Sequence, residues 1–178
     1  MDSINRNQPE DNHADLAGSA AVDRIKQVVD KTASCFFCTE VGVGPSSGTR
    51  PMSVQRVDDD GTLWFLSASD SHKNAEIAQR SRVDLYFQGS EHSGFLHLAG
   101  SASISTDKST IKQLWKPLLK TWFTGGVDDP RITALRVAPD AGYYWDNKHG
   151  NAVAGIKMLI GAAIGKTLDD SIEGTVQV

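Results

Sequence analysis

The stretch RPMSVQRVDDDGTLWFLSASDSHK, residues 50–73, indicates the local architecture most clearly. Residues 50–57 alternate apolar and polar side chains, which predicts a strand, and residues 63–67 predict a second one. The Asp-Asp-Gly sequence at 59–61 predicts a tight turn between them, because glycine adopts turn conformations at no steric cost. We therefore expect an antiparallel hairpin, followed by a short helix that is capped within residues 69–71.

Three polar side chains of this stretch are expected to lie close together. Arg50 begins the first strand and Ser67 ends the second, and an antiparallel hairpin places these positions side by side. Lys73 follows in the first turn of the helix, where backbone N–H groups are free. Arginine, lysine and serine together predict a site for one phosphate group. The alternative, solvated charges on the rim of a barrel, stays open at this point.

The other segments predict a mainly β fold, a six- to seven-stranded antiparallel barrel with flanking helices. Further strands are expected at residues 35–41, 83–87, 95–105, 133–137 and 142–146. Helices are expected at 21–32 and from 107 onwards, where Pro117 imposes a kink or a division into two helices. The polar residues 1–20 predict a disordered tail, residues 42–48 a loop and residues 151–165 a helix.

Composition limits the classes of partner. The chain has 178 residues, 39% of them hydrophobic and 22% charged, which is typical of one soluble domain. Its net charge of -4 gives no bulk attraction to nucleic acid or anionic lipid, so we expect neither as a partner. The longest apolar run, Met158–Ile164, is far shorter than the roughly 20 residues that span a bilayer. With few cysteines and no signal-peptide pattern, we expect a cytoplasmic location.

Two cysteines raise the question of a metal or redox site. Cys35 and Cys38 lie in a predicted strand, where residues three apart point to opposite faces. No second pair of cysteine or histidine ligands completes a tetrahedral zinc site. We therefore expect structural thiols and no metal, and the missing Gly-x-Ser-x-Gly motif leaves no catalytic residue to predict.

Aromatic side chains gather in two places. Trp115, Leu118 and Trp122 recur at helical spacing, which favours packing in the core or at a subunit interface over a cofactor wall. Tyr143 and Trp145 alternate onto one face of a predicted strand, and this face could meet a flat ring.

The order of these motifs resembles the FMN-binding split-barrel family typified by pyridoxamine 5′-phosphate oxidase. The resemblance rests first on Arg50-Pro51-Met52, Leu63-Trp64-Phe65-Leu66-Ser67 and Ser71-His72-Lys73. Later motifs are similar to the general stress protein branch, and they are Ala99-Gly100-Ser101-Ala102, Leu114-Trp115-x-Pro117-Leu118, Trp122-Phe123-x-x-Gly126, Asp129-Pro130 and Tyr144-Trp145-Asp146. The match covers about Ala21 to Asn147, which implies a domain at 21–147 between a tail at 1–20 and a partly helical extension at 148–178.

The resemblance implies a flavin site and a homodimer. Arg50 and Lys73 would hold the FMN phosphate, with Ser71 and His72 beside Lys73. The other residues that would pass along the flavin are Pro51, Met52, Ser53, Val54, Leu66 and Ser67. The flavin would lie between two subunits, so the partner chain would contribute Trp115 and the strand of Tyr144 and Trp145. FMN is the expected cofactor and FAD the alternative, ahead of the haem or deazaflavin used elsewhere in this fold.

Two departures argue against oxidation of vitamin B6. Gln55 stands five residues after Arg50, where the oxidase has a lysine, and this removes one cation near the phosphate. The chain ends Glu-Gly-Thr-Val-Gln-Val instead of in an Arg-Leu-x-Pro segment that helps to hold the substrate. Two functions stay open: a flavin-binding general stress protein, or a flavin-dependent oxidoreductase that uses NAD(P)H or a small reductant. The second needs no catalytic motif, because the flavin itself carries the chemistry.

Overall fold

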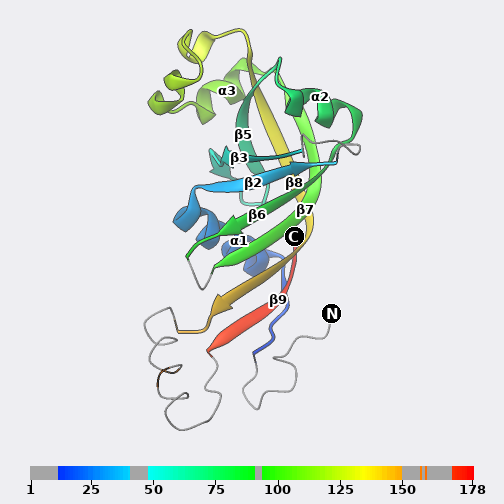
Figure 1. Cartoon of the computed structure of the whole chain (residues 1–178), viewed down its shortest axis with the longest axis vertical. Helices are drawn as coiled ribbons and strands as arrows, with labels where there is room; N and C mark the ends of the chain where they lie inside the picture. The colour runs from blue at the N-terminus through cyan, green and yellow to red at the C-terminus, as the bar shows by residue number, and fades with distance from the viewer. Residues whose placement is uncertain (1–11, 41–47, 91–93, 150–156, 158, 160–169) are drawn as a thin grey trace.

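One sheet forms the body of the molecule (Figure 1). The computed structural model describes residues 12–40, 48–90, 94–149, 157, 159 and 170–178. Over these residues the sheet has nine strands: β1 (Leu16–Ala17), β2 (Ser34–Thr39), β3 (Thr49–Ser53), β4 (Arg56–Val57), β5 (Leu63–Ala68), β6 (Arg82–Gln88), β7 (Phe95–Ser105), β8 (Ile132–Asn147) and β9 (Ser171–Gln177). The helices are α1 (Ser19–Thr32), α2 (His72–Gln79) and α3 (Lys108–Leu114), with short 3-10 helices η2 (Pro117–Thr121) and η3 (Gly126–Asp128).

The strands close into a barrel because the chain changes partner after β3. Neighbours β3, β2, β6, β7 and β8 pair antiparallel in that order, and β5 pairs with the first part of β8. After Ser53 the chain bends toward β5, where the N–H of Gln55 donates to the carbonyl of Trp64 at 2.8 Å and β4 pairs with β5. The mainly β barrel with flanking helices is therefore confirmed.

The hairpin of residues 50–67 differs from its prediction. Its turn is present, since Gly61 has a φ of 79° and its N–H donates to the carbonyl of Asp58 at 3.0 Å. Only Arg56 and Val57 pair with the second strand, however, whereas β3 pairs with β2. The single predicted strand is thus two, because a small barrel must bend its strands to close.

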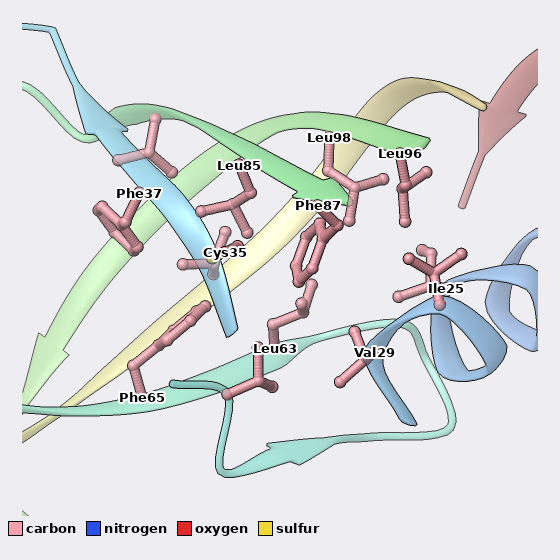
Figure 2. Packing of buried hydrophobic residues seen from close by; sticks show 14 of the residues in the cluster. Ile25, Val29, Cys35, Phe37, Leu63, Phe65, Leu85, Phe87, Leu96 and Leu98 are labelled. Atoms are coloured by element: carbon pink, nitrogen blue, oxygen red, sulfur yellow. The ribbon is translucent and has the colours of Figure 1, made fainter. Parts of the chain in front are cut away.

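Alternate strand residues fill the barrel (Figure 2). The rings of Phe37 and Phe65 meet edge to face, with 5.3 Å between their centroids. Ile25 and Val29 of α1 point into the same cluster, so α1 covers part of the barrel core (Figure 2). Full burial of one such side chain contributes about 1.5–3 kcal/mol. The helix expected at 21–32 is confirmed, and it begins at Ser19.

A second cluster packs α3 and η2 against β5 and β8. It contains Leu66, Ile111, Leu114, Phe123, Ile132 and Ala134, all buried. Asp107 caps α3, accepting from the N–H groups of Ser109 and Thr110, and the division at Pro117 is confirmed. The single apolar face predicted for this segment is wrong, because Leu118 and Trp122 are 73% and 63% exposed. A 3-10 turn changes the helical spacing and directs these two side chains outward.

Residues near both ends of the described chain join the sheet, where we expected a tail at 1–20 and an extension at 148–178. β8 runs unbroken where two strands were predicted, and its second half pairs antiparallel with β9. β9 in turn pairs in parallel with β1. The approach is close: a Cβ on Gly174 would lie 1.9 Å from the carbonyl oxygen of Ala14. Residues 12–18 and 171–177 therefore belong to the sheet rather than to flanking extensions.

Three expectations lie outside the described residues: most of the 42–48 loop, the helix at 151–165, and the tail before residue 12. Among the helices that the structure describes, none combines the length and apolar character needed to cross a membrane.

Candidate functional site

A pocket of about 320 Å³ lies at the start of α2. Its lining residues are Arg50 from β3 and Ser71, His72, Lys73 and Glu76 from α2, and we call it the α2 pocket. Ser71 caps the helix, because its hydroxyl accepts from the N–H of Asn74 at 3.3 Å. Lys73 and Glu76 are three residues apart in a helix, so both point to the same side. Local helix geometry thus gathers four of the five lining residues.

Lys73 is the unusual member of this pocket. It is 7% exposed, and within the described part of the chain its ammonium group forms no hydrogen bond or ion pair. Burial, with a further contribution from the positive charge of Arg50, lowers the pKa of Lys73 to about 8. The negative charge of Glu76 opposes this lowering of the pKa only in part. A largely buried cation is costly, and a bound anion would relieve that cost.

Arg50 is held in place by Glu76. Nη1 of Arg50 donates to Oε2 of Glu76 at 2.6 Å, and Oγ1 of Thr39 donates to the same oxygen at 2.6 Å. Burial opposes ionisation of Glu76, but these hydrogen bonds outweigh it and keep its pKa below the ordinary value. The α2 pocket therefore contains two cations and one carboxylate.

A buried polar network anchors the start of α2 to the barrel. Ser67 Oγ donates to Asn74 Oδ1 at 2.7 Å and lies 3.2 Å from Ser71 Oγ. Asn74 Nδ2 donates to Thr133 Oγ1 at 2.9 Å. Ser67 and Arg50 were expected to be neighbours on paired strands, but β3 pairs with β2 and β5 with β8. Ser67 contacts Ser71, which lines the α2 pocket together with Arg50. Ser67 thus stabilises the start of α2 without lining the pocket itself.

A second hollow of about 590 Å³ lies over β2, β6, β7 and β8. Four of its lining residues, Phe36, Tyr86, His97 and Trp145, form what we call the aromatic face. Phe36 pairs with Tyr86 and Tyr86 with His97 in the strand register, so their side chains form a row. Phe36, Tyr86 and Trp145 are 58%, 47% and 45% exposed. Exposed aromatic groups of this extent are typical of interaction surfaces.

The aromatic face is ordered by direct contacts. The rings of Tyr86 and His97 stack with centroids 4.6 Å apart and planes 12° apart. His97 Nε2 is 2.7 Å from Asp84 Oδ1, which fixes the imidazole ring. Pro51 of β3 faces Phe36 and lines the same hollow. β3 therefore separates the two features, with Arg50 in the α2 pocket and Pro51 at the aromatic face.

The remaining predicted site residues are dispersed. Met52 packs against the barrel core, Val54 and Leu66 are buried, and Ser53 is exposed at the end of β3. Trp115 lies in the second cluster, where its ring is 6.4 Å from that of Phe123, and lines neither hollow. Of the two aromatic candidates, the structure places only Trp145 at an exposed hollow.

Several residues of these features, among them Phe36 and His97, were not predicted. Glu76 and Asn74 follow Lys73 within one helical turn, and this spacing could have identified them. Tyr86 joins the aromatic face only through strand pairing, which the sequence alone does not give.

Cys35 and Cys38 are free thiols on opposite faces of β2. Burial raises the pKa of the Cys35 thiol to about 12, so this cysteine has the character of a core residue, as expected.

Solved structures resemble this fold. A candidate general stress protein 26 from Jannaschia sp. CCS1 is 22% identical, with a TM-score of 0.68 over 90% of this chain and 100% of the other. The general stress FMN/FAD binding protein of Xanthomonas citri is 28% identical, with a TM-score of 0.58 over 67% and 84% of the two chains.

Among characterised sequences, Protein bli-3 of Neurospora crassa is 27% identical over 105 residues. The alignment spans 54% of this chain but only half of the length of bli-3. The sequence model of a family described as pyridoxamine 5′-phosphate oxidase like matches residues 20–169, which is most of the chain. The match includes both hollows and the strands that form them, and the chain therefore belongs to the pyridoxamine 5′-phosphate oxidase-like family.

Proposed function

We propose that this protein binds a flavin, FMN or alternatively FAD, and that the α2 pocket holds a phosphate of this ligand. The observation that carries the proposal is Lys73, a lysine only 7% exposed that lines the pocket beside Arg50 and forms no hydrogen bond within the described chain. Arg50 offers N–H donors in a fixed fork, and the start of α2 adds its positive dipole end. A phosphate would supply the missing negative charge.

The ring of the flavin would extend from the α2 pocket along β3. Within the described residues β3 has one strand partner, β2, so its other edge is available to a ligand. Backbone groups of Pro51, Met52 and Ser53 could then meet the polar edge of the ring. The family, and a structural relative described as FMN/FAD binding, support a flavin over other phosphate-bearing ligands.

A second copy of the chain would complete the site by covering the aromatic face. Pro51 touches this face, so a flavin beside β3 would lie at its border. A partner on the aromatic face would bury Phe36, Tyr86 and Trp145, and aromatic residues of this kind dominate interface energetics. We therefore propose a homodimer with flavin at the interface, in which Trp145 contributes and Trp115 remains a packing residue.

The role that fits these features is that of a flavin-holding protein of the general stress type. Gln55 stands where the oxidase has a lysine, which removes one cation near the phosphate, so oxidation of pyridoxamine phosphate is not expected.

Titration of purified apoprotein with FMN tests the proposal. Flavin fluorescence should be quenched in a saturable way at micromolar protein, because the ring becomes stacked and shielded from water. Absence of quenching would remove flavin binding as the function.

Reduction by NADPH separates a holding protein from a reductase. In stopped-flow experiments we expect the bound flavin to bleach no faster than free FMN. Clearly faster bleaching would favour the flavin-dependent oxidoreductase.

A further inference from the structure

Glu76 is a carboxylate inside a pocket that is otherwise suited to an anion. It lines the α2 pocket together with Arg50 and Lys73, and it accepts hydrogen bonds from Arg50 and Thr39 at 2.6 Å each. Its side chain is 17% exposed, so solvent screens its charge only in part. If Glu76 served only to position Arg50, it would not need a negative charge, because an uncharged acceptor oxygen could also accept the hydrogen bond from Arg50.

The charges of the pocket can be counted. Arg50 and protonated Lys73 contribute two positive charges and Glu76 one negative charge, which leaves one net positive charge. His72 at the pocket edge is exposed and adds a cation only when protonated. A phosphodiester carries one negative charge per phosphate, whereas a phosphomonoester such as FMN carries close to two at neutral pH. The pocket therefore matches a singly charged phosphate.

We propose that Glu76 determines which phosphate the α2 pocket accepts, by setting its charge to suit a monoanion. This inference rests on the proposed flavin function and deepens it. A flavin dinucleotide such as FAD has two phosphates with one negative charge each, so the phosphate held in the pocket is singly charged without a proton change. FMN fits the same pocket with one proton retained on its phosphate, so its binding takes up a proton near neutral pH.

The variant Glu76→Gln separates the effect of the Glu76 charge from the role of Glu76 in positioning Arg50. Glutamine keeps an oxygen that can accept from Arg50 Nη1 and Thr39 Oγ1, but it removes the negative charge. The pocket then carries two net positive charges and suits a dianion. Glu40→Gln is the matched control, because Glu40 is an exposed carboxylate whose contact with Arg80 is 3.4 Å long.

Calorimetric titration of wild type, Glu76→Gln and Glu40→Gln with FMN, FAD and riboflavin at pH 7 tests the inference. We expect Glu76→Gln to raise the affinity ratio of FMN to FAD by about fivefold, since the doubly charged phosphate gains most from loss of the repulsion. Glu40→Gln should leave the ratio unchanged, and riboflavin should bind all three proteins equally.

An unchanged ratio, a ratio shifted toward FAD, or loss of both flavins from a folded Glu76→Gln protein would overturn the inference while leaving flavin binding intact. A wild-type protein that binds neither flavin would instead overturn the proposed function and this inference with it.

Wild-type protein provides a second test that does not depend on the folding of a variant. FMN titrated at pH 7 in two buffers with different ionisation enthalpies should show proton uptake, and FAD clearly less. Equal proton uptake for the two flavins would contradict the assigned role of Glu76.

Discussion

The α2 pocket and the aromatic face border the same strand, β3, but they are built in opposite ways. The α2 pocket is lined by charged residues of one chain, with Lys73 only 7% exposed. The aromatic face is open, and Phe36, one of its members, is 58% exposed. Charged side chains that are already in position are needed to hold a phosphate. A flat ring, in contrast, can be covered by the surface of a second subunit.

This difference assigns separate tasks to the two features. Affinity for a phosphate should depend on the α2 pocket, and assembly should depend on the aromatic face. Changes in one feature should therefore leave the property of the other unaltered, which the following variants examine.

The largest effect is expected for Arg50→Ala. It removes a charge-assisted donor, whose loss costs about 1.5–3 kcal/mol, or about ten- to hundredfold in FMN affinity. Fluorescence quenching measures the affinity, and Arg80→Ala, on an exposed ion pair, serves as the control. Full FMN affinity in Arg50→Ala would refute the assignment of the phosphate to the α2 pocket.

Phe36→Asp should act on assembly instead. A charge on the aromatic face should weaken the dimer by about 2 kcal/mol, or about thirtyfold in dissociation constant, as expected for an aromatic interface contact. Light scattering after gel filtration measures the effect. Leu118→Asp is the control, because Leu118 is 73% exposed on η2 and lies outside the aromatic face. A dimer equally stable in both variants would place the interface elsewhere.

The pH dependence of FMN binding should reveal the protonation of Lys73. The pKa of Lys73 is about 8 in the unliganded pocket, and a bound phosphate would raise it. Above pH 8 FMN must therefore bind together with a proton on Lys73, and this proton should lower the affinity by about a further tenfold per pH unit. Titrations from pH 7 to 9.5 measure the slope, which should be less steep in Lys73→Met by this contribution. An equally steep slope in Lys73→Met would assign the proton to another group.

Lys73→Met should also stabilise the apoprotein, by about 2 kcal/mol at pH 7, since a buried unpaired charge is replaced by an apolar chain. The pKa of Lys73 is lower in the folded protein than its ordinary value of 10.5. The unfolded chain thus binds more protons between pH 8 and 10.5, and the wild type gains stability as pH rises through this window.

Urea unfolding of both proteins at pH 7 and pH 10 measures the difference. The difference in free energy of unfolding between the two proteins should be smaller at pH 10 than at pH 7. An equal difference at both pH values would mean that the charge of Lys73 does not destabilise the folded protein.

The sequence predicted the α2 pocket better than the aromatic face, for a physical reason. Ser71, His72 and Lys73 are neighbours in one helix start, and capping and helical spacing are local properties. Arg50 was assigned correctly to the pocket, although the predicted hairpin contact with Ser67 was wrong, because β3 turns away from β5.

The aromatic face depends on pairing between strands that are distant in sequence. Phe36, Tyr86 and His97 become neighbours only through the register of β2, β6 and β7. β9 was missed for a similar reason: its residues Ser171–Gln177 carry a weak apolar pattern and are fixed by contacts with β8 and with Ala14.

The central claim is that the α2 pocket binds the phosphate of a flavin. Parallel titration of the wild-type protein with FMN and riboflavin tests it most directly, because the two ligands differ only in the phosphate. The account predicts that FMN binds at least about tenfold more tightly, in line with the contribution of one charge-assisted hydrogen bond. Equal affinity for FMN and riboflavin would contradict it.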